Sequence, residues 1–123
     1  MQQSLIKLII NEAKKCIQED NYEILDYREK NKDSLKKYGF NGDFLIRELI
    51  EELDETNYKK GPTSEQDPTK NPGNVYEFIK NINCINDNYN VDFFIKFKFE
   101  HVGDCKLIVI SLHESGMYDW KED

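Results

Sequence analysis

The clearest hydrophobic pattern lies in two stretches near the C-terminal end of the chain, residues 91–100 and 106–114. The first has apolar side chains at alternate positions, which is typical of a strand with one packed face and one face open to solvent or ligand. The second is apolar on both faces until Ser111, as in a central strand that is covered on both sides. Gly103 and Asp104 lie between them, so the two stretches are predicted to form a hairpin with a tight turn.

A third strand is predicted over residues 75–82, because large apolar side chains recur there at even-numbered positions. Glu77 falls on one face, and the opposite face carries Tyr76, Phe78, Lys80 and Ile82. Residues 83–90 are rich in turn formers, which favours a second hairpin. The three strands are therefore predicted to form an antiparallel meander.

Helical periodicity comes before the strands. Apolar side chains at three- and four-residue steps predict helices over residues 4–18, 31–38 and 42–53. Helices followed by strands predict an α+β fold, with the N-terminal helices packed on one face of an antiparallel β-sheet and the other face partly open. Residues 20–30 fit either a short strand or an extended connection. The candidate caps are Ser4 for the first helix, Asn31 or Asp33 for the second, Asn41 or Asp43 for the third, and Gly39 for the end of the second.

Residues 59–74 contain all three prolines of the chain and no packing side chain. Sixteen such residues make a long connection for a small domain, and loops of this kind are either functional or flexible. We interpret the segment as a functional loop, with a plain linker as the alternative.

Length and composition limit the class of protein. A chain of 123 residues is expected to form a single domain, 1–123, with one core. No apolar run is long enough for a membrane span, and no signal peptide is evident, so we expect a cytoplasmic protein that does not contact a membrane. Three scattered cysteines do not suggest a disulfide framework. His101 and Cys105 could share a metal, but two surface residues beside a turn is the favoured interpretation.

The net charge of −7 does not favour nucleic-acid binding. The charge is unevenly distributed, however: residues 1–55 and 99–123 each carry a balance of −4, whereas residues 56–98 carry +1. A phosphate-binding site would therefore be expected within residues 56–98.

The order of these features resembles the MqsR-type toxins of bacterial type II toxin–antitoxin systems, within the RelE-like group of ribonucleases. The resemblance covers roughly residues 30–114. The segments that carry it are Leu35-Lys-Lys-Tyr-Gly39, Leu49–Leu53, Tyr58-Lys-Lys-Gly-Pro62 with Asp67, Val75-Tyr-Glu-Phe78, Phe94-Ile-Lys-Phe97 and Ile110-Ser-Leu-His-Glu114.

The resemblance implies a RelE-like fold and an mRNA interferase, which is a hydrolase-type endoribonuclease that cuts mRNA by attack of the 2′-hydroxyl on the adjacent phosphate. It implies no metal and no cofactor. The implied partners are the mRNA substrate and a cognate antitoxin protein, with no membrane and no direct contact with DNA. The implied catalytic residues are Lys60, Asp67, Lys96 and His113, and the implied substrate-binding residues are Tyr58, Lys59 and Lys98.

Two departures from the family pattern bear on activity. The family often has Tyr where this chain has Phe94, and its members are commonly more basic. Considered singly, His113 fits a buried structural histidine as well as a catalytic one, Lys60 and Lys96 fit solvated surface groups, and Asp67 before a proline fits a turn former.

A second hypothesis therefore remains: a non-catalytic acidic binding protein, either an immunity protein or an antitoxin, that masks a basic partner. Its contact groups would be Glu48, Glu51, Glu52 and Asp54.

Overall fold

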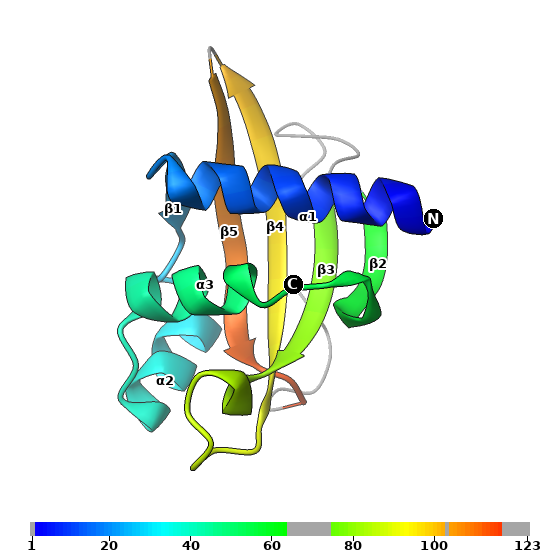
Figure 1. Ribbon diagram of the computed structural model, residues 1–123. Helices are drawn as coiled ribbons and strands as arrows, with labels where there is room; N and C mark the ends of the chain where they lie inside the picture. Colours follow the sequence, from blue (N-terminus) through cyan, green and yellow to red (C-terminus); the bar gives the residue numbers. More distant parts are fainter. Residues whose placement is uncertain (1, 64–74, 103, 117–123) are drawn as a thin grey trace.

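The computed structural model describes residues 2–63, 75–102 and 104–116. Three α-helices, two short 3-10 helices and five strands follow one another along the chain (Figure 1). Their bounds are α1 Gln3–Gln18, β1 Tyr22–Ile24, α2 Glu29–Tyr38, α3 Gly42–Glu51, η1 Glu55–Asn57, β2 Tyr58–Thr63, β3 Val75–Asn81, η2 Ile82–Cys84, β4 Asp92–Val102 and β5 Asp104–Glu114.

The five strands form one sheet in the order β1-β5-β4-β3-β2. The pairs β2–β3, β3–β4 and β4–β5 are antiparallel, whereas β1 pairs parallel with β5. The predicted α+β class, with helices packed on a mostly antiparallel sheet, is confirmed and is consistent with a RelE-like arrangement. The stretch that fitted either a short strand or an extended connection contains the short strand β1, which adds to the antiparallel strands by pairing parallel with β5.

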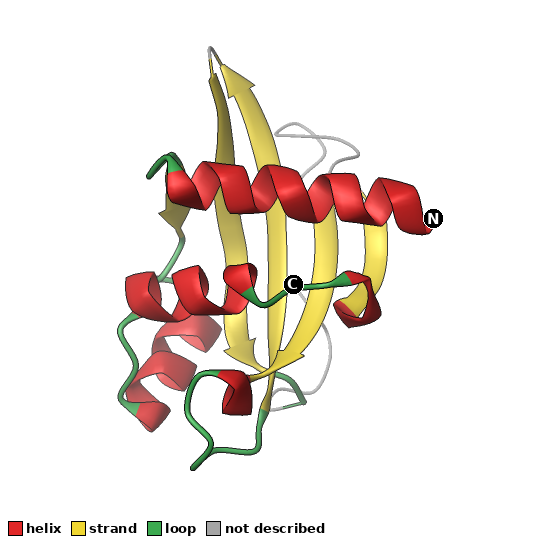
Figure 2. Cartoon of the chain, viewed as in Figure 1, coloured by secondary structure: helices red, strands yellow, loops and turns green. Residues whose placement is uncertain are grey.

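Helices α1 and α3 lie across the same face of the sheet (Figures 1 and 2). We call this the covered face. Its strand side chains include the fully buried Phe78, Phe93, Phe97, Leu107 and Leu112. They pack with the buried side of α1, at Ile6, Ile10, Ala13, Cys16 and Ile17, and with that of α3, at Leu45, Ile46, Leu49 and Ile50. The alternation of strands with the helical stripes of α1 and α3 thus produces the main core.

Helix α2 lies beside the edge of β5 beyond the end of β1 (Figure 1). Asn31 is 1% exposed; its Nδ2 donates to the carbonyls of Leu25 and Ile110, each at 2.9 Å, and its Oδ1 accepts from Leu112 N at 2.8 Å. Ser34 Oγ accepts from Glu114 N at 3.0 Å. Two side chains of a helix therefore complete the hydrogen bonds of a strand edge, which explains why Asn31 does not cap its own helix.

The helix ends show which local signals decided the structure. Asn41 caps α3 by accepting from Phe44 N at 3.0 Å, and Gly39 ends α2 with φ +70°, as expected. Ser4 is not a cap, because α1 already begins at Gln3, and neither Asn31 nor Asp33 caps α2, whose cap residue is Arg28.

The predicted loop 59–74 is wrong at its start, because Lys59–Thr63 belong to β2. Tyr58 anchors this strand with its ring at 5.9 Å from that of Phe78, edge to face. Gly61 has φ +125°, and a Cβ there would lie 2.6 Å from the carbonyl oxygen of Val75. Only glycine fits so close to β3, so a polar segment without alternating apolar residues still forms a strand. Residues 64–74 lie outside the described part of the chain.

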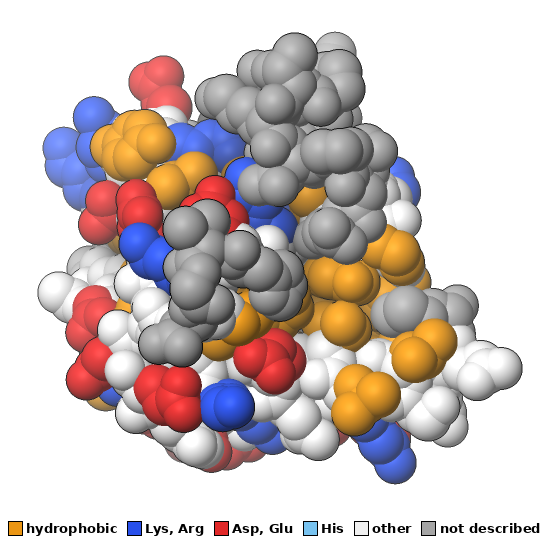
Figure 3. Space-filling model, turned by 90° about the horizontal axis from the view of Figure 1, so that it is seen from above, with side chains coloured by type: hydrophobic (Ala, Val, Ile, Leu, Met, Phe, Trp, Pro, Cys, Tyr) orange, Lys and Arg blue, Asp and Glu red, His pale blue; other side chains and the backbone are white. Residues whose placement is uncertain are grey.

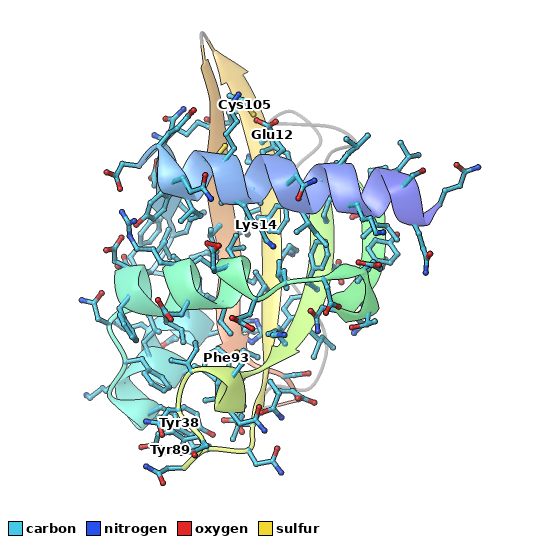
Figure 4. All side chains as sticks on the ribbon, in the orientation of Figure 1. Glu12, Lys14, Tyr38, Tyr89, Phe93 and Cys105 are labelled. Atoms are coloured by element: carbon cyan, nitrogen blue, oxygen red, sulfur yellow. The ribbon has the colours of Figure 1, made fainter. Side chains whose placement is uncertain are left out.

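Aromatic rings hold the connection between β3 and β4 against the end of α2. The ring of Tyr38 lies 5.3 Å from that of Tyr89 and 5.9 Å from that of Phe93, both edge to face (Figure 4). In the described residues no helix is both long and apolar enough to cross a bilayer.

Candidate functional site

The side of the sheet opposite α1 and α3 carries a row of charged residues on neighbouring strands. We call this side the uncovered face, because no helix crosses it in the described part of the chain (Figure 2). Lys60 of β2 is opposite Glu77 of β3, Glu77 is opposite Lys96 of β4, and Lys96 is opposite Ser111 of β5. Residues opposite one another point to the same face, so the four residues form one charged row.

A second row runs beside the first. Ile79 of β3 is opposite Phe94 of β4, and Phe94 is opposite His113 of β5, with ring centroids 5.3 Å apart. Lys59 Nζ lies 5.6 Å from the centroid of the Phe94 ring, within range of a cation–π interaction. The aromatic row thus brings a third lysine to the charged row.

An irregularity in β2 directs two consecutive lysines to this face. Tyr58 is opposite Phe78 and Lys60 is opposite Glu77, so two steps along β2 match one step along β3. This is the count of a β-bulge, in which the extra residue departs from strict alternation. Lys59 therefore lies over Phe94, beside Lys60, whereas Tyr58 packs on the covered face with its hydroxyl donating to the Gly61 carbonyl. The structure does not bring Tyr58 to the lysines.

The spacing of the rows suits a phosphodiester. Lys60 and Lys96 are separated by one intervening strand, hence by roughly 10 Å between backbones. Lys96 and His113 are diagonal neighbours on adjacent strands, at about 7–8 Å. Flexible lysine side chains on such a grid can converge on one phosphate group.

Exposure falls steadily from β2 to β5. Lys59 and Lys60 are exposed, Glu77 and Lys96 are half-buried, and Ser111 and His113 are only 2% and 3% exposed. His113 Nδ1 lies 3.2 Å from the Glu114 carbonyl oxygen, which can only accept, so this contact requires a proton on Nδ1. The burial of His113 favours a structural role for this residue over a catalytic one.

Two other expected residues stand apart from the charged row. Lys98 is 7% exposed between Val75 and Ile108, and its Nζ pairs with Glu100 Oε2 at 3.8 Å. It therefore shares the face but lies in an apolar setting. Asp67 lies outside the described residues.

Two residues of the site, Glu77 and Ser111, were not predicted from the sequence. Glu77 stands between Lys60 and Lys96, and Ser111 stands beside Lys96. The alternation of residues 75–82 already placed Glu77 away from the aromatic face, but only the strand register shows which side chains it meets.

One group of metal-ligating side chains occurs elsewhere among the described residues. Glu12, Cys16 and Cys105 have a carboxylate oxygen and two sulfurs within 4.8 Å of one another, at the crossing of α1 and β5. Burial raises the pKa of Cys16, and burial together with Cys16 and Glu12 raises the pKa of Cys105 from 9.0 to about 12. Both thiols are therefore neutral near pH 7. The backbone of His101 is opposite that of Cys105.

The described surface also carries an open groove away from the charged row. An open groove of about 230 Å³ between α1 and η1 is lined by both lysines and acids, with Lys7 Nζ 3.6 Å from Glu55 Oε1. Seen from above, acidic and basic side chains are mixed on the left of the described surface, and hydrophobic ones gather on the right (Figure 3).

Comparison of the chain with protein-family models, with curated proteins and with solved structures found no match. Any function must therefore be argued from the site itself.

Proposed function

We propose that the chain is a metal-independent endoribonuclease, acting as the toxin of a bacterial type II toxin–antitoxin system. The observation that carries this proposal is the charged row, in which Lys60 and Lys96 flank Glu77 on one sheet face. Four of the sequence segments that resemble MqsR-type toxins include residues of the strands β2, β3, β4 and β5 that form this row. The nuclease chemistry rests on the row, and the toxin role rests on the resemblance.

The proposed reaction transfers a phosphoryl group within the RNA. The 2′-oxygen attacks the adjacent phosphorus, the bond from phosphorus to the 5′-oxygen breaks, and the products are a 2′,3′-cyclic phosphate and a 5′-hydroxyl. A base must remove the 2′-hydroxyl proton, an acid must protonate the leaving oxygen, and cations must stabilise the charge on the phosphorane.

The charged row supplies each of these groups. Glu77 takes the proton, Lys96 stabilises the charge on the phosphorane, and the exposed Lys60 donates a proton to the leaving oxygen. Lys59 binds a neighbouring phosphate from its position over Phe94. His113 is a positioning residue in this scheme, because it is buried and its ring packs against Phe94 beside Lys96.

The test is cleavage of a labelled RNA by the purified full chain in the presence of a metal chelator. We expect cleavage with 2′,3′-cyclic phosphate ends, and about a 10²-fold lower rate for Lys60→Ala and for Lys96→Ala, the usual size for a positioned catalytic group. The matched control is Lys106→Ala, which removes a lysine from the same face. Lys106 Nζ pairs with Glu23 Oε1 at 3.3 Å, outside the charged row.

Two results would contradict the proposal. One is loss of wild-type cleavage when the chelator removes metal ions, and the other is undiminished cleavage by both lysine variants. A second test is expression in a bacterial host, where the wild-type chain is expected to arrest growth and Lys96→Ala is expected to relieve the arrest.

The second candidate is an acidic protein that masks a basic partner. Glu48, Glu51, Glu52 and Asp54 are all exposed on α3 and the turn after it, which supports this function. The Asp54 carboxylate, however, accepts from Thr56 N at 2.9 Å, and hydrogen bonds from Thr56 lower its pKa. Unimpaired growth with the wild-type chain, together with absent RNA cleavage, would favour this candidate.

A further inference from the structure

Two cysteines and a carboxylate from separate parts of the chain meet where α1 crosses β5. Glu12 and Cys16 are four residues apart on α1, so they share one side of the helix. Cys105 is the second residue of β5. The carboxylate oxygen and both sulfurs lie within 4.8 Å of one another, and Figure 4 shows Glu12 and Cys105 side by side at this crossing.

The backbone around these side chains is fixed by hydrogen bonds from both elements. Cys16 Sγ donates to the Cys105 carbonyl at 3.4 Å, and Asn21 Nδ2 donates to the same carbonyl at 2.6 Å. Cys16 is 1% exposed, and Glu12 and Cys105 are half-buried. The three donor groups therefore converge on a supported position that solvent can still reach.

The charge at this position favours a cation. Glu12 is half-buried, and the Cys105 thiol hydrogen-bonds with its carboxylate, so a negative charge lies beside the two sulfurs.

We propose that Glu12, Cys16 and Cys105 form a binding site for a Zn²⁺ ion, with two thiolates, one carboxylate and a water as its four ligands. Two sulfurs select a borderline-soft metal over Mg²⁺ or Ca²⁺, and tetrahedral Zn²⁺ is the divalent ion that this set suits best. Binding replaces the two thiol protons, which are released to solvent, and forms two zinc–sulfur bonds.

The geometry needs only a small adjustment. Zinc–sulfur bonds of about 2.3 Å place neighbouring ligand atoms of a tetrahedron roughly 3.3–3.8 Å apart. The three ligand atoms lie within 4.8 Å of one another, so they must approach by no more than about 1.5 Å. Rotation of the side chains on α1 can provide this movement. The bound ion would join α1 to β5 on the covered side, away from the charged row, so the site is independent of the proposed nuclease activity.

The test is titration of the reduced full chain with Zn²⁺ in competition with a chromogenic chelator, in a non-thiol reductant. We expect one ion per chain, and a loss of affinity of at least about 100-fold for Cys16→Ser and Cys105→Ser, the upper end of what even supporting residues contribute. With Co²⁺ in place of Zn²⁺, the wild-type chain should show a cobalt–thiolate charge-transfer band that both variants lack.

The matched controls are Cys84→Ser, an exposed cysteine elsewhere, and Glu48→Gln, an exposed acid of α3 on the same side of the sheet; both should bind as the wild type does. Glu12→Gln should bind more weakly while keeping the cobalt–thiolate band. Folding of every variant is checked by circular dichroism. The proposal is overturned if the wild-type chain binds no stoichiometric Zn²⁺, or if Cys84→Ser loses binding as far as Cys16→Ser does.

Discussion

The two faces of the sheet are built from alternate residues of the same strands, yet among the described residues only one of them carries a row of charged side chains. On the covered face, Phe93, Phe97 and Phe78 are fully buried and contact one another or the helices. On the uncovered face, the positions between them hold Lys96, Glu77 and Phe94. A strand of period two can therefore serve stability with one half of its residues and chemistry with the other half.

The difference between the two faces indicates which substitutions should lower stability and which should lower activity. Removal of a ring from the covered face leaves a cavity in a close-packed core. When a charged side chain is removed from the uncovered face, solvent can fill its position. The substitution should therefore lower activity rather than stability.

The largest expected effect is on the covered face. Phe97→Ala should lower the free energy of unfolding by about 3–5 kcal/mol, because the Phe97 ring is fully buried and stacks on Phe78 at 5.3 Å. Lys96→Ala, one residue away, should change it by less than about 1 kcal/mol. Urea denaturation followed by circular dichroism measures both. Equal losses in the two variants would remove the distinction between the faces.

The next effect concerns the strand that delivers the lysines. Gly61→Ala should displace β2, because the new Cβ would lie 2.6 Å from the Val75 carbonyl oxygen at φ +125°. We expect a loss of about 1–3 kcal/mol in stability from backbone strain and a clear drop in RNA cleavage. Gly39→Ala, at φ +70° with open space around it, is the control: it should cost about 1–2 kcal/mol and leave cleavage unchanged.

A smaller effect on stability is expected at high pH and comes from titratable side chains on the covered face. Burial raises the pKa of Tyr76 and Cys16, and that of Cys105 from 9.0 to about 12. A group whose pKa is raised by folding stabilises the fold below its ordinary pKa, and this contribution is lost as pH rises toward the folded-state pKa. Stability should therefore fall between about pH 9 and 12. Cys105→Ser should make the fall less steep in thermal melts across this range, whereas Lys60→Ala should not.

The smallest expected effect concerns the role of Glu77 in RNA binding and cleavage on the uncovered face. Glu77→Gln removes a negative charge from between Lys60 and Lys96. RNA binding should become several-fold tighter and more salt-dependent, because two lysines then meet the phosphates without a competing acid. Cleavage should nevertheless slow, since the proposed base is lost. Filter binding at several salt concentrations and single-turnover cleavage separate the two results, and faster cleavage would contradict the role given to Glu77.

Sequence reasoning succeeded where local pattern and tertiary packing agree. The alternation in residues 91–100 and the apolar run in 106–114 predicted β4 and β5, and Asn41 and Gly39 predicted helix ends. Each of these signals needs only neighbours in sequence.

It failed where distant residues decide the structure. β2 has no apolar alternation and exists because Gly61 fits against Val75, and Asn31 bonds to β5 rather than to its own helix. Lys60 and Lys96 could be chosen from a resemblance, but Glu77 could join them only through the register of β2, β3 and β4. The bulge that places Lys59 beside Lys60, and Tyr58 on the opposite face, has no signal in the sequence.

The bonds from Asn31 and Ser34 to β5 also have a consequence for assembly. Beyond the short β1, the edge of β5 is met by α2, whose Asn31 amide and Ser34 hydroxyl occupy the hydrogen-bonding positions that another strand would need. Within the described residues, an incoming extended peptide can therefore add only next to the three-residue β1 or next to β2, where Pro62 and the irregular backbone leave it few regular hydrogen-bonding positions. The molecule is in this way protected against open-ended polymerisation through its sheet.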